Sequence, residues 1–272
     1  MDGPKPPEVP KTGTMTYGDY LKVPELLGLQ HPQSQPAHHD ELLFIIIHQA
    51  YELWFKLVLH EIANTIRYMD EDKVLRAHHF MRRVAKIQEV LLHQIHILET
   101  MAPAEFAEFR DELRPASGFQ SVQFREIEFA AGIKEEAYLR FFKDRPELVS
   151  RLEQRLAGRT VWDAYSELMA RRFPDIPLND AVRRVYETQH DHLELFLLSE
   201  SLVDFDEYLA LWRFHHVKVV ERVIGGKPGT GGSAGVNYLR TTVDKKAFPL
   251  LWDVRAELGT TTYGETAGVP RR

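Results

Sequence analysis

The stretch LWRFHHVKVVERVIGGKPGTGGSAG, residues 211–235, joins a helical pattern to a loop of opposite character. Its first half carries apolar residues at helical spacing and two adjacent histidines, and this pattern stops at Gly225. The eleven residues from Gly225 to Gly235 include six glycines. A loop with so few side chains cannot fill a core, but its backbone can approach a ligand closely. The stretch predicts a long helix whose last turns hold a flat cofactor, beside a loop that covers a substrate.

Helical periodicity extends outward from this stretch over most of the chain. Alternating strand patterns bounded by turns are scarce, so the sequence predicts an all-α fold. Long helices are expected at 40–69, 73–100, 179–198 and 201–224, the first with Asp40 as its N-cap. Shorter helices are expected at 104–113, 121–131, 135–142, 146–157, 160–173 and 248–257.

A single domain at 15–258 is the simplest organisation, because no segment has the composition of a linker between domains. We expect a bundle of long helices with a small helical insertion at roughly 134–175. Residues 1–14 contain four prolines, and residues 259–272 are rich in glycine and threonine. Both ends are therefore expected to be disordered tails.

The composition excludes several classes of site. The chain of 272 residues has a formal net charge of −6 with both signs interleaved, which argues against a nucleic-acid surface. It has no cysteine, so disulfides, zinc–thiolate sites, iron–sulfur clusters and haem attached through cysteine are excluded. The longest uninterrupted apolar run, 42–47, is too short to cross a membrane. A soluble cytoplasmic protein is expected.

An aromatic helix face surrounds one histidine in the segment 44–55. Phe44, His48, Tyr51, Glu52 and Phe55 are spaced so that they share this face. An isolated histidine of this kind is usually a core residue bonded to a backbone carbonyl. The aromatic neighbours favour the alternative, a pocket for a flat ligand.

Two further segments carry candidate binding groups. Arg110 lies one turn after Phe106 and can clamp a substrate carboxylate, although an ion pair with a nearby acid is the more common role of such an arginine. The loop segment 229–234 fits a loose dinucleotide-binding pattern. That fold requires a strand before the loop, and here a helix precedes it. The loop is therefore predicted to cover a substrate.

Other polar sets are weaker candidates. Glu89, His93 and His96 share a helix face and form a conceivable metal set, but a lone helix seldom supplies enough ligands. Glu187 and His190 form half of a di-iron signature whose second copy is missing, so a surface pair is expected. Four further histidines are expected at the surface: His38, His39, His78 and His79.

Five motifs, in this order and at these separations, resemble the tryptophan 2,3-dioxygenase family, and the compact length resembles its bacterial members. The resemblance runs from about residue 17 to residue 258. The motifs are YGDY at 17–20, HDELLFIIIHQAYELWFK at 39–56, ILETMAPAEFAEFR at 97–110, PASGFQSVQFR at 115–125, and the segment 212–241.

The resemblance implies an all-α enzyme that binds haem b without a covalent link. Such an enzyme inserts both atoms of O₂ across the C2–C3 bond of the indole of L-tryptophan, giving N-formyl-L-kynurenine. The family is tetrameric, so a homotetramer is expected. In this reading the domain at 15–258 is a haem dioxygenase domain.

The resemblance also assigns roles to single residues. His216 matches the axial ligand of the haem iron, whereas His215 does not occupy the matching position. His48 matches the distal histidine, expected to accept a hydrogen bond from the indole N–H and to position the substrate. Arg110 matches the clamp on the substrate carboxylate.

The remaining matched positions surround these three residues. At Phe106 the family varies between tyrosine and phenylalanine, and phenylalanine removes any phenolic contact to the carboxylate. Further substrate positions are Phe44, Phe106, Leu113 and Thr230, where Thr230 contacts the amino-acid end of the substrate. Positions near the haem edge are Ser117 and Gly118. Residues that reach into a neighbouring subunit's pocket are Tyr17 and Tyr20.

A non-catalytic haem-binding sensor remains the alternative function. It would share His216 and the helical pocket. It would not need Arg110 and Thr230 to converge on an amino-acid head group. The related indoleamine dioxygenases share the chemistry but accept other indoles, and the Thr230 loop and the Tyr17 region favour the stricter enzyme.

Overall fold

The computed structural model describes residues 13, 15–231 and 235–259. Over these residues the chain forms twelve α-helices, three 3₁₀ helices and no strand, which confirms the all-α prediction. The expected tails fall almost entirely outside the described residues. The elements are α1 (Tyr17–Leu21), α2 (Val23–Leu27), α3 (His39–Asp70), α4 (Val74–Leu98), α5 (Pro103–Phe109), η1 (Arg110–Leu113), η2 (Gly118–Gln120), α6 (Val122–Ala131), η3 (Glu136–Phe142), α7 (Pro146–Ala157), α8 (Val161–Arg172), α9 (Leu178–Glu187), α10 (Leu193–Ile224), α11 (Val236–Arg240) and α12 (Pro249–Glu257).

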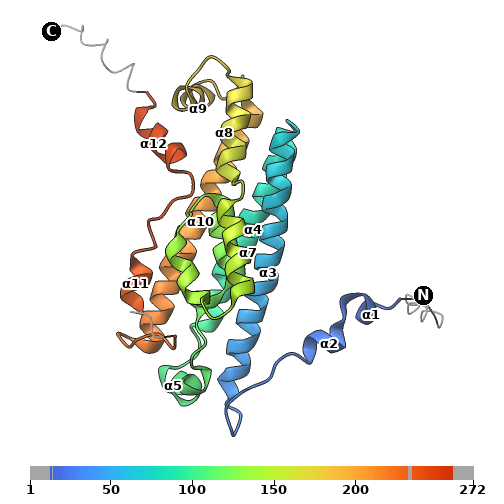
Figure 1. Cartoon of the computed structure of the whole chain (residues 1–272), viewed down its shortest axis with the longest axis vertical. Helices are drawn as coiled ribbons and strands as arrows, with labels where there is room; N and C mark the ends of the chain where they lie inside the picture. The colour runs from blue at the N-terminus through green and yellow to red at the C-terminus, as the bar shows by residue number, and fades with distance from the viewer. Residues whose placement is uncertain (1–12, 14, 232–234, 260–272) are drawn as a thin grey trace, which may run out of the picture.

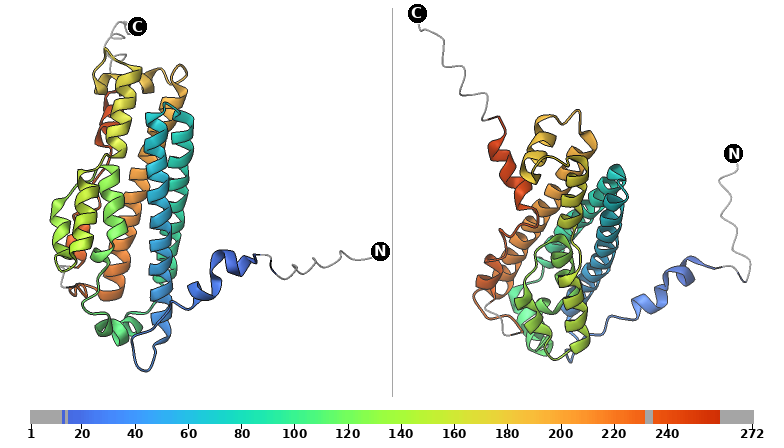
Figure 2. Two further views of the ribbon diagram at one scale, coloured as in Figure 1. Left: turned by 45° about the vertical axis from the view of Figure 1, so that its right-hand side comes forward. Right: turned by 45° about the horizontal axis from the view of Figure 1, so that its top comes forward.

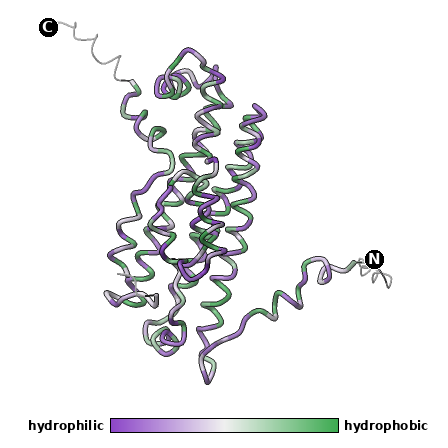
Figure 3. Tube along the Cα trace, viewed as in Figure 1, coloured by the Kyte–Doolittle hydropathy of each residue, from purple (hydrophilic) through white to green (hydrophobic). Residues whose placement is uncertain are grey.

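Three long helices, α3, α4 and α10, run side by side along the long axis of the molecule (Figure 1). Helix α4 packs against both of the others. Apolar and polar residues alternate over short intervals along these helices (Figure 3), as expected for helices with one face in a core. On α3 the buried apolar residues follow a spacing of three or four: Ile47, Tyr51, Phe55, Val58 and Ile62.

Helix α3 is also long and apolar enough to cross a membrane, by length and composition alone. The core helix of a soluble protein passes the same test. In this chain α3 packs against α4, α6 and α8, so its buried side is already occupied by protein.

The start of α3 differs from the prediction. The N-cap is His38, and Asp40 lies inside the first turn. The buried carboxylate of Glu41 accepts hydrogen bonds from the backbone N–H groups of Gln33 (2.6 Å) and Ser34 (3.1 Å). These bonds hold the incoming chain against the helix. The expectation that Asp40 is the N-cap was therefore wrong.

The break between the last two long helices also lies elsewhere than predicted. Helix α9 ends at Glu187, and α10 begins at Leu193 and continues through the expected break near residue 200. Thr188 is the C-cap of α9, where the backbone leaves the helical conformation (φ −121°, ψ 45°), and its hydroxyl donates to the carbonyl of Arg184 (2.8 Å). Ser199 and Ser201 lie buried within α10, and their hydroxyls are satisfied by carbonyls of the same helix.

The small helical insertion expected at roughly 134–175 has two parts with different packing. Helices η3 and α7 pack on α6 around their own apolar cluster, formed by Phe129, Tyr138, Phe142 and Leu152. Helix α8, in contrast, packs on α3 and belongs to the main core.

An N-terminal arm, α1 and α2, extends away from the bundle (Figures 1 and 2). These helices were not predicted. The start of α1 is fixed by a reciprocal cap, in which the Asp19 backbone N–H donates to the Thr16 hydroxyl and the Asp19 carboxylate accepts from Thr16. The arm exposes large apolar side chains, including Tyr17 (79 %), Tyr20 (71 %) and Leu27 (71 %).

Candidate functional site

A cavity of about 540 Å³ opens between α3, the end of α4, α5, the 116–121 turn and the last turns of α10. It brings together nine of the eleven residues predicted for the site. They are Phe44, His48, Phe106, Arg110, Leu113, Ser117, Gly118, His216 and Thr230. Tyr17 and Tyr20 lie on α1, outside the cavity of this chain.

His48 combines both roles considered for it from the sequence. Its Nδ1 lies 2.7 Å from the carbonyl oxygen of Phe44, so Nδ1 carries the proton and donates. The neutral ring then leaves Nε2 as a hydrogen-bond acceptor. The pKa of His48 lies below its ordinary value because the surrounding protein desolvates the imidazolium; the Phe44 carbonyl and the Glu52 carboxylate oppose this shift. His48 is therefore a neutral acceptor on the cavity wall.

Aromatic rings line the cavity beside His48. The Phe44 ring lies 4.1 Å from the His48 ring and 5.8 Å from the Phe106 ring, measured between centroids. Deeper in the bundle Tyr51 stacks on Phe55 at 6.0 Å, and its hydroxyl donates to the carbonyl of Leu91 (2.8 Å). The Tyr51 hydroxyl is thus already paired. These rings give the cavity flat apolar walls suited to an aromatic ligand.

His216 enters the same cavity from α10. Its ring stacks on Trp212, with centroids 5.1 Å apart and planes 22° apart. Burial lowers the pKa of His216 to about 4, with smaller contributions from His48 and Arg125. The neutral imidazole has a lone pair available for a metal ion. Its neighbour His215 does not line the cavity and packs instead against His96, at 5.3 Å between ring centroids.

Arg110 does not form the ion pair that was the simpler expectation. Its guanidinium donates to the carbonyl of Pro228, and no acid pairs with it among the described residues. The Nε atom of Arg110 is buried and has no hydrogen-bond partner among the residues that the structure describes. The charge of Arg110 is therefore available to an anionic group in the cavity.

The glycine-rich loop is fastened over the 115–118 turn. The Thr230 hydroxyl donates to the carbonyl of Ala116 (2.6 Å), which leaves its lone pairs free to accept from a ligand. A Cβ atom at Gly231 would lie 2.5 Å from the Cβ of Ser117, so this approach requires glycine. Gly235 has a φ of 60°, and a Cβ atom there would lie 2.8 Å from the carbonyl oxygen of Lys227. A side chain at this position would therefore also be strained. Residues 232–234 of the predicted loop lie outside the described residues.

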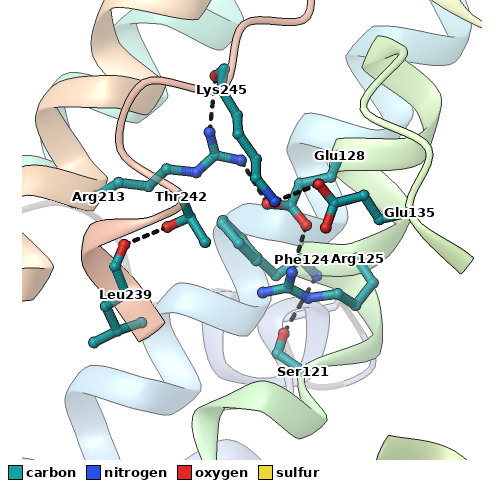
Figure 4. Close-up of polar contacts among 9 residues, drawn as sticks. All are labelled: Ser121, Phe124, Arg125, Glu128, Glu135, Arg213, Leu239, Thr242 and Lys245. Atoms are coloured by element: carbon teal, nitrogen blue, oxygen red, sulfur yellow. Dashed lines mark hydrogen bonds and ion pairs between the residues drawn. The ribbon is translucent and has the colours of Figure 1, made fainter. Parts of the chain in front are cut away.

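A charged network forms another wall of the cavity (Figure 4). Glu128 accepts from Arg125 Nη1 and from Arg213 Nη2, both at 2.6 Å. Arg213 Nη1 also donates to the carbonyl of Lys245, whose ammonium pairs with Glu135. Arg125, Glu128 and Arg213 are all buried and all line the cavity. Two guanidinium groups share one carboxylate, so this wall carries an excess of positive charge.

The sequence interpretation missed this network. Arg213 lies three residues before His216, so the helical spacing already placed both on one face of α10. Arg125 and Glu128 are likewise three residues apart on α6. No local pattern shows that α6 and α10 bring the two pairs together across the cavity.

The other polar residues considered as candidates from the sequence lie outside the cavity, and their surroundings differ. The Glu89 carboxylate bonds to Lys86 and Tyr208, and the His93 Nδ1 atom lies 2.7 Å from the backbone carbonyl of Glu89. Glu187 and His190 are exposed and lie on either side of the end of α9, as expected for a surface pair. His78 is only partly exposed, and its buried Nδ1 atom has no hydrogen-bond partner within the described parts of the chain, so the expectation of a simple surface residue was wrong for it.

Comparison with known proteins identifies the family. The family model described as tryptophan 2,3-dioxygenase matches residues 5–172 and 163–258. A tryptophan 2,3-dioxygenase of Nocardioides sp. is 47 % identical over 254 residues, covering 90 % of this chain and 95 % of the relative. Relatives of the same name from Myxococcus xanthus (41 %) and Serratia proteamaculans (40 %) each cover 90 % of the chain, and the matches cover 90 % and 94 % of their lengths. The chain belongs to the tryptophan 2,3-dioxygenase family.

Proposed function

We propose that this chain uses haem b to insert both atoms of O₂ across the C2–C3 bond of the indole of L-tryptophan, giving N-formyl-L-kynurenine. Its family supports tryptophan dioxygenase activity. One observation carries the assignment to this cavity. A neutral histidine from α10, a neutral acceptor histidine from α3 and an arginine that no acid pairs with among the described residues line the same cavity.

The residues present fit a haem. The neutral imidazole of His216 is the group that would bind the iron, since its lone pair is not used by protonation at pH 7. The excess positive charge at Arg125 and Arg213 suits the propionate groups of a porphyrin. The buried Nε of Arg125 has no partner among the described residues, which is consistent with an anionic neighbour that completes it. Ferrous haem, when bound, supplies the binding and activation of O₂.

The protein's own part in the reaction is to hold and orient the substrate. Arg110 would bind the carboxylate through charged hydrogen bonds, and the acceptor lone pairs of Thr230 would receive the ammonium group. His48 Nε2 would accept the indole N–H, which fixes the orientation of the C2–C3 bond. An indole N–H is a very weak acid, so positioning rather than proton removal is the role we assign to His48.

The indole ring itself would rest on apolar side chains. Phe44 and Phe106 provide adjacent ring faces, and Leu113 lines the same cavity. Because position 106 is phenylalanine, it adds no hydrogen bond to the carboxylate. The 116–118 turn, with Ser117 and Gly118, would lie near the haem edge and is held by the loop through Thr230.

The chain is also proposed to be a soluble cytoplasmic homotetramer, acting on tryptophan and O₂ without a nucleic acid or a membrane. The exposed apolar residues of the N-terminal arm support an assembly in which the arm packs on another subunit. In that arrangement Tyr17 and Tyr20 would reach the neighbouring cavity. Exposed apolar residues on α3 suit a buried position in such an assembly as well: Leu42, Ile46 and Leu53.

The alternative of a haem-binding sensor is separated from the enzyme by one experiment. Haem-loaded, reduced protein is incubated with L-tryptophan under air, and O₂ consumption and N-formylkynurenine are followed together. The dioxygenase consumes one O₂ for each product molecule formed. A protein that shows a haem spectrum and turns over no tryptophan would be a sensor, and the assignment of Arg110 and Thr230 would fail.

A further inference from the structure

A second cluster of metal-binding side chains lies outside the cavity. His96 and Glu99 at the end of α4 and His215 on α10 offer ligand atoms that all lie within 4.8 Å of one another. His96 Nδ1 is 3.3 Å from a carboxylate oxygen of Glu99. The rings of His96 and His215 are 5.3 Å apart and nearly perpendicular, at 89°. None of the three residues lines the cavity described above.

The packing of two helices explains why these residues meet. His96 and Glu99 are three residues apart, so they share one face at the end of α4. Helix α4 packs against α10, which carries His215. His215 and His216 are adjacent and therefore point about 100° apart around the helix axis. His216 enters the cavity, and His215 meets α4 on a different face of the same helix pair.

The donor set is typical of a divalent transition metal. Two imidazoles and one carboxylate, with room for water, form zinc sites in many proteins, whereas Mg²⁺ and Ca²⁺ prefer all-oxygen sets. Ligand atoms at about 2.0–2.2 Å from a tetrahedral zinc ion lie roughly 3.3–3.6 Å apart. His96 and Glu99 already have this separation. His215 is partly exposed, so its side chain can close the remaining distance.

The neighbouring charges do not prevent such a site. Arg222 Nη1 lies 3.8 Å from the Glu99 carboxylate; the Glu99 side chain is 20 % exposed, but the arginine side chain is 65 % exposed and can move away into solvent. Surface ion pairs of this kind contribute little to stability. A metal ion bound by three side chains would replace this contact without breaking any part of the core.

We propose that His96, Glu99 and His215 form a binding site for a divalent transition-metal ion, with Zn²⁺ the best fit. The ion would link the end of α4 to α10 at His215, the residue immediately before His216. This proposal does not depend on the function proposed above, because it uses none of the cavity residues.

The test is a calorimetric titration of the purified full chain with Zn²⁺ after removal of metals by EDTA. The expected result is one Zn²⁺ bound per chain and a higher unfolding temperature with zinc, because a ligand that binds the folded state stabilises it. Loss of even an outer partner of a metal site weakens binding by about 10- to 100-fold. The variants His215→Ala and Glu99→Gln should therefore each weaken zinc binding by at least tenfold.

His93→Ala is the matched control. His93 lies on α4 with its ring 6.5 Å from that of His96, but its Nδ1 is bonded to the carbonyl of Glu89 and it is outside the cluster. This variant should bind zinc as the original protein does. An unchanged helical circular dichroism spectrum in all variants shows that they are folded. Equal zinc affinity in all four proteins, or zinc binding weaker than about 1 mM, would overturn the proposal.

Discussion

His48 donates from Nδ1 to the carbonyl oxygen of Phe44, four residues earlier on α3, at 2.7 Å. This bond fixes the tautomer of His48 and leaves Nε2 as an acceptor toward the cavity. The same bond holds the ring beside Phe44, at 4.1 Å between centroids. One hydrogen bond thus sets both the orientation and the chemical character of the residue proposed to receive the indole N–H.

Replacing His48 by alanine should weaken the enzyme without abolishing it. Loss of a positioning contact can cost about 100-fold in kcat/KM. The variant should also lose the ability to distinguish L-tryptophan from its N1-methylated analogue, which has no indole N–H to donate. Steady-state kinetics with both substrates measure this. Complete inactivity of the variant would instead support an obligatory base.

The dependence of kcat/KM on pH should reflect the low pKa of His48. Because burial shifts this pKa below the ordinary value of 6.5, the ring stays neutral above pH 6.5 and keeps its acceptor. As the pH falls through the lowered pKa, Nε2 gains a proton and can no longer accept the indole N–H. An acid limb with its midpoint below 6.5, absent from His48→Ala, is expected. A midpoint above 6.5 in the original enzyme would contradict the account.

Replacing Arg110 by alanine should raise the KM for L-tryptophan far more than that for tryptamine, which lacks the carboxylate. Hydrogen bonds to charged groups contribute about 1.5–3 kcal/mol, which corresponds to roughly 10- to 150-fold in affinity. Competition or kinetic measurements with both compounds give the comparison. Equal effects on the two would remove Arg110 from the proposed carboxylate site.

The approach of the loop to Ser117 gives a backbone test. In Gly231→Ala the new Cβ would meet the Cβ of Ser117 at 2.5 Å, so the loop must move and the Thr230 bond to Ala116 should be lost. We expect a higher KM for L-tryptophan with an unchanged haem spectrum. Gly226→Ala is the matched control, because a Cβ there meets nothing within 4 Å. Similar kinetics for both variants would show that the loop does not depend on this close approach.

The sequence was sufficient to predict most of the helices, because the helical spacing of apolar residues is a local signal. In α3, α4 and α10 this spacing marks the face that is buried in the core. It was insufficient at several helix boundaries, where the backbone and single polar side chains decide. The break at 188–192 lies in a polar segment, whereas α10 runs uninterrupted through Ser199, whose hydroxyl is bonded to the helix itself. The arm helix α1 depends on the cap between Thr16 and Asp19.

The candidate site could be predicted where the family motifs are continuous in sequence, as around His48 and Arg110. Only the family resemblance distinguished His216 from its neighbour His215 as the expected iron ligand. The structure then shows that His216 enters the cavity and His215 does not. The pairing of Arg213 with Glu128 and the meeting of His96 with His215 depend on the packing of separate helices. No pattern within one segment could have revealed either.

The most direct test of the central claim is the visible absorption spectrum of the ferrous protein, compared between the original chain and His216→Ala and recorded with and without L-tryptophan. The account predicts a Soret band in the original protein that shifts when tryptophan is added, and loss or altered ligation of haem in the variant. A variant with the same ferrous spectrum and the same tryptophan response as the original would contradict it.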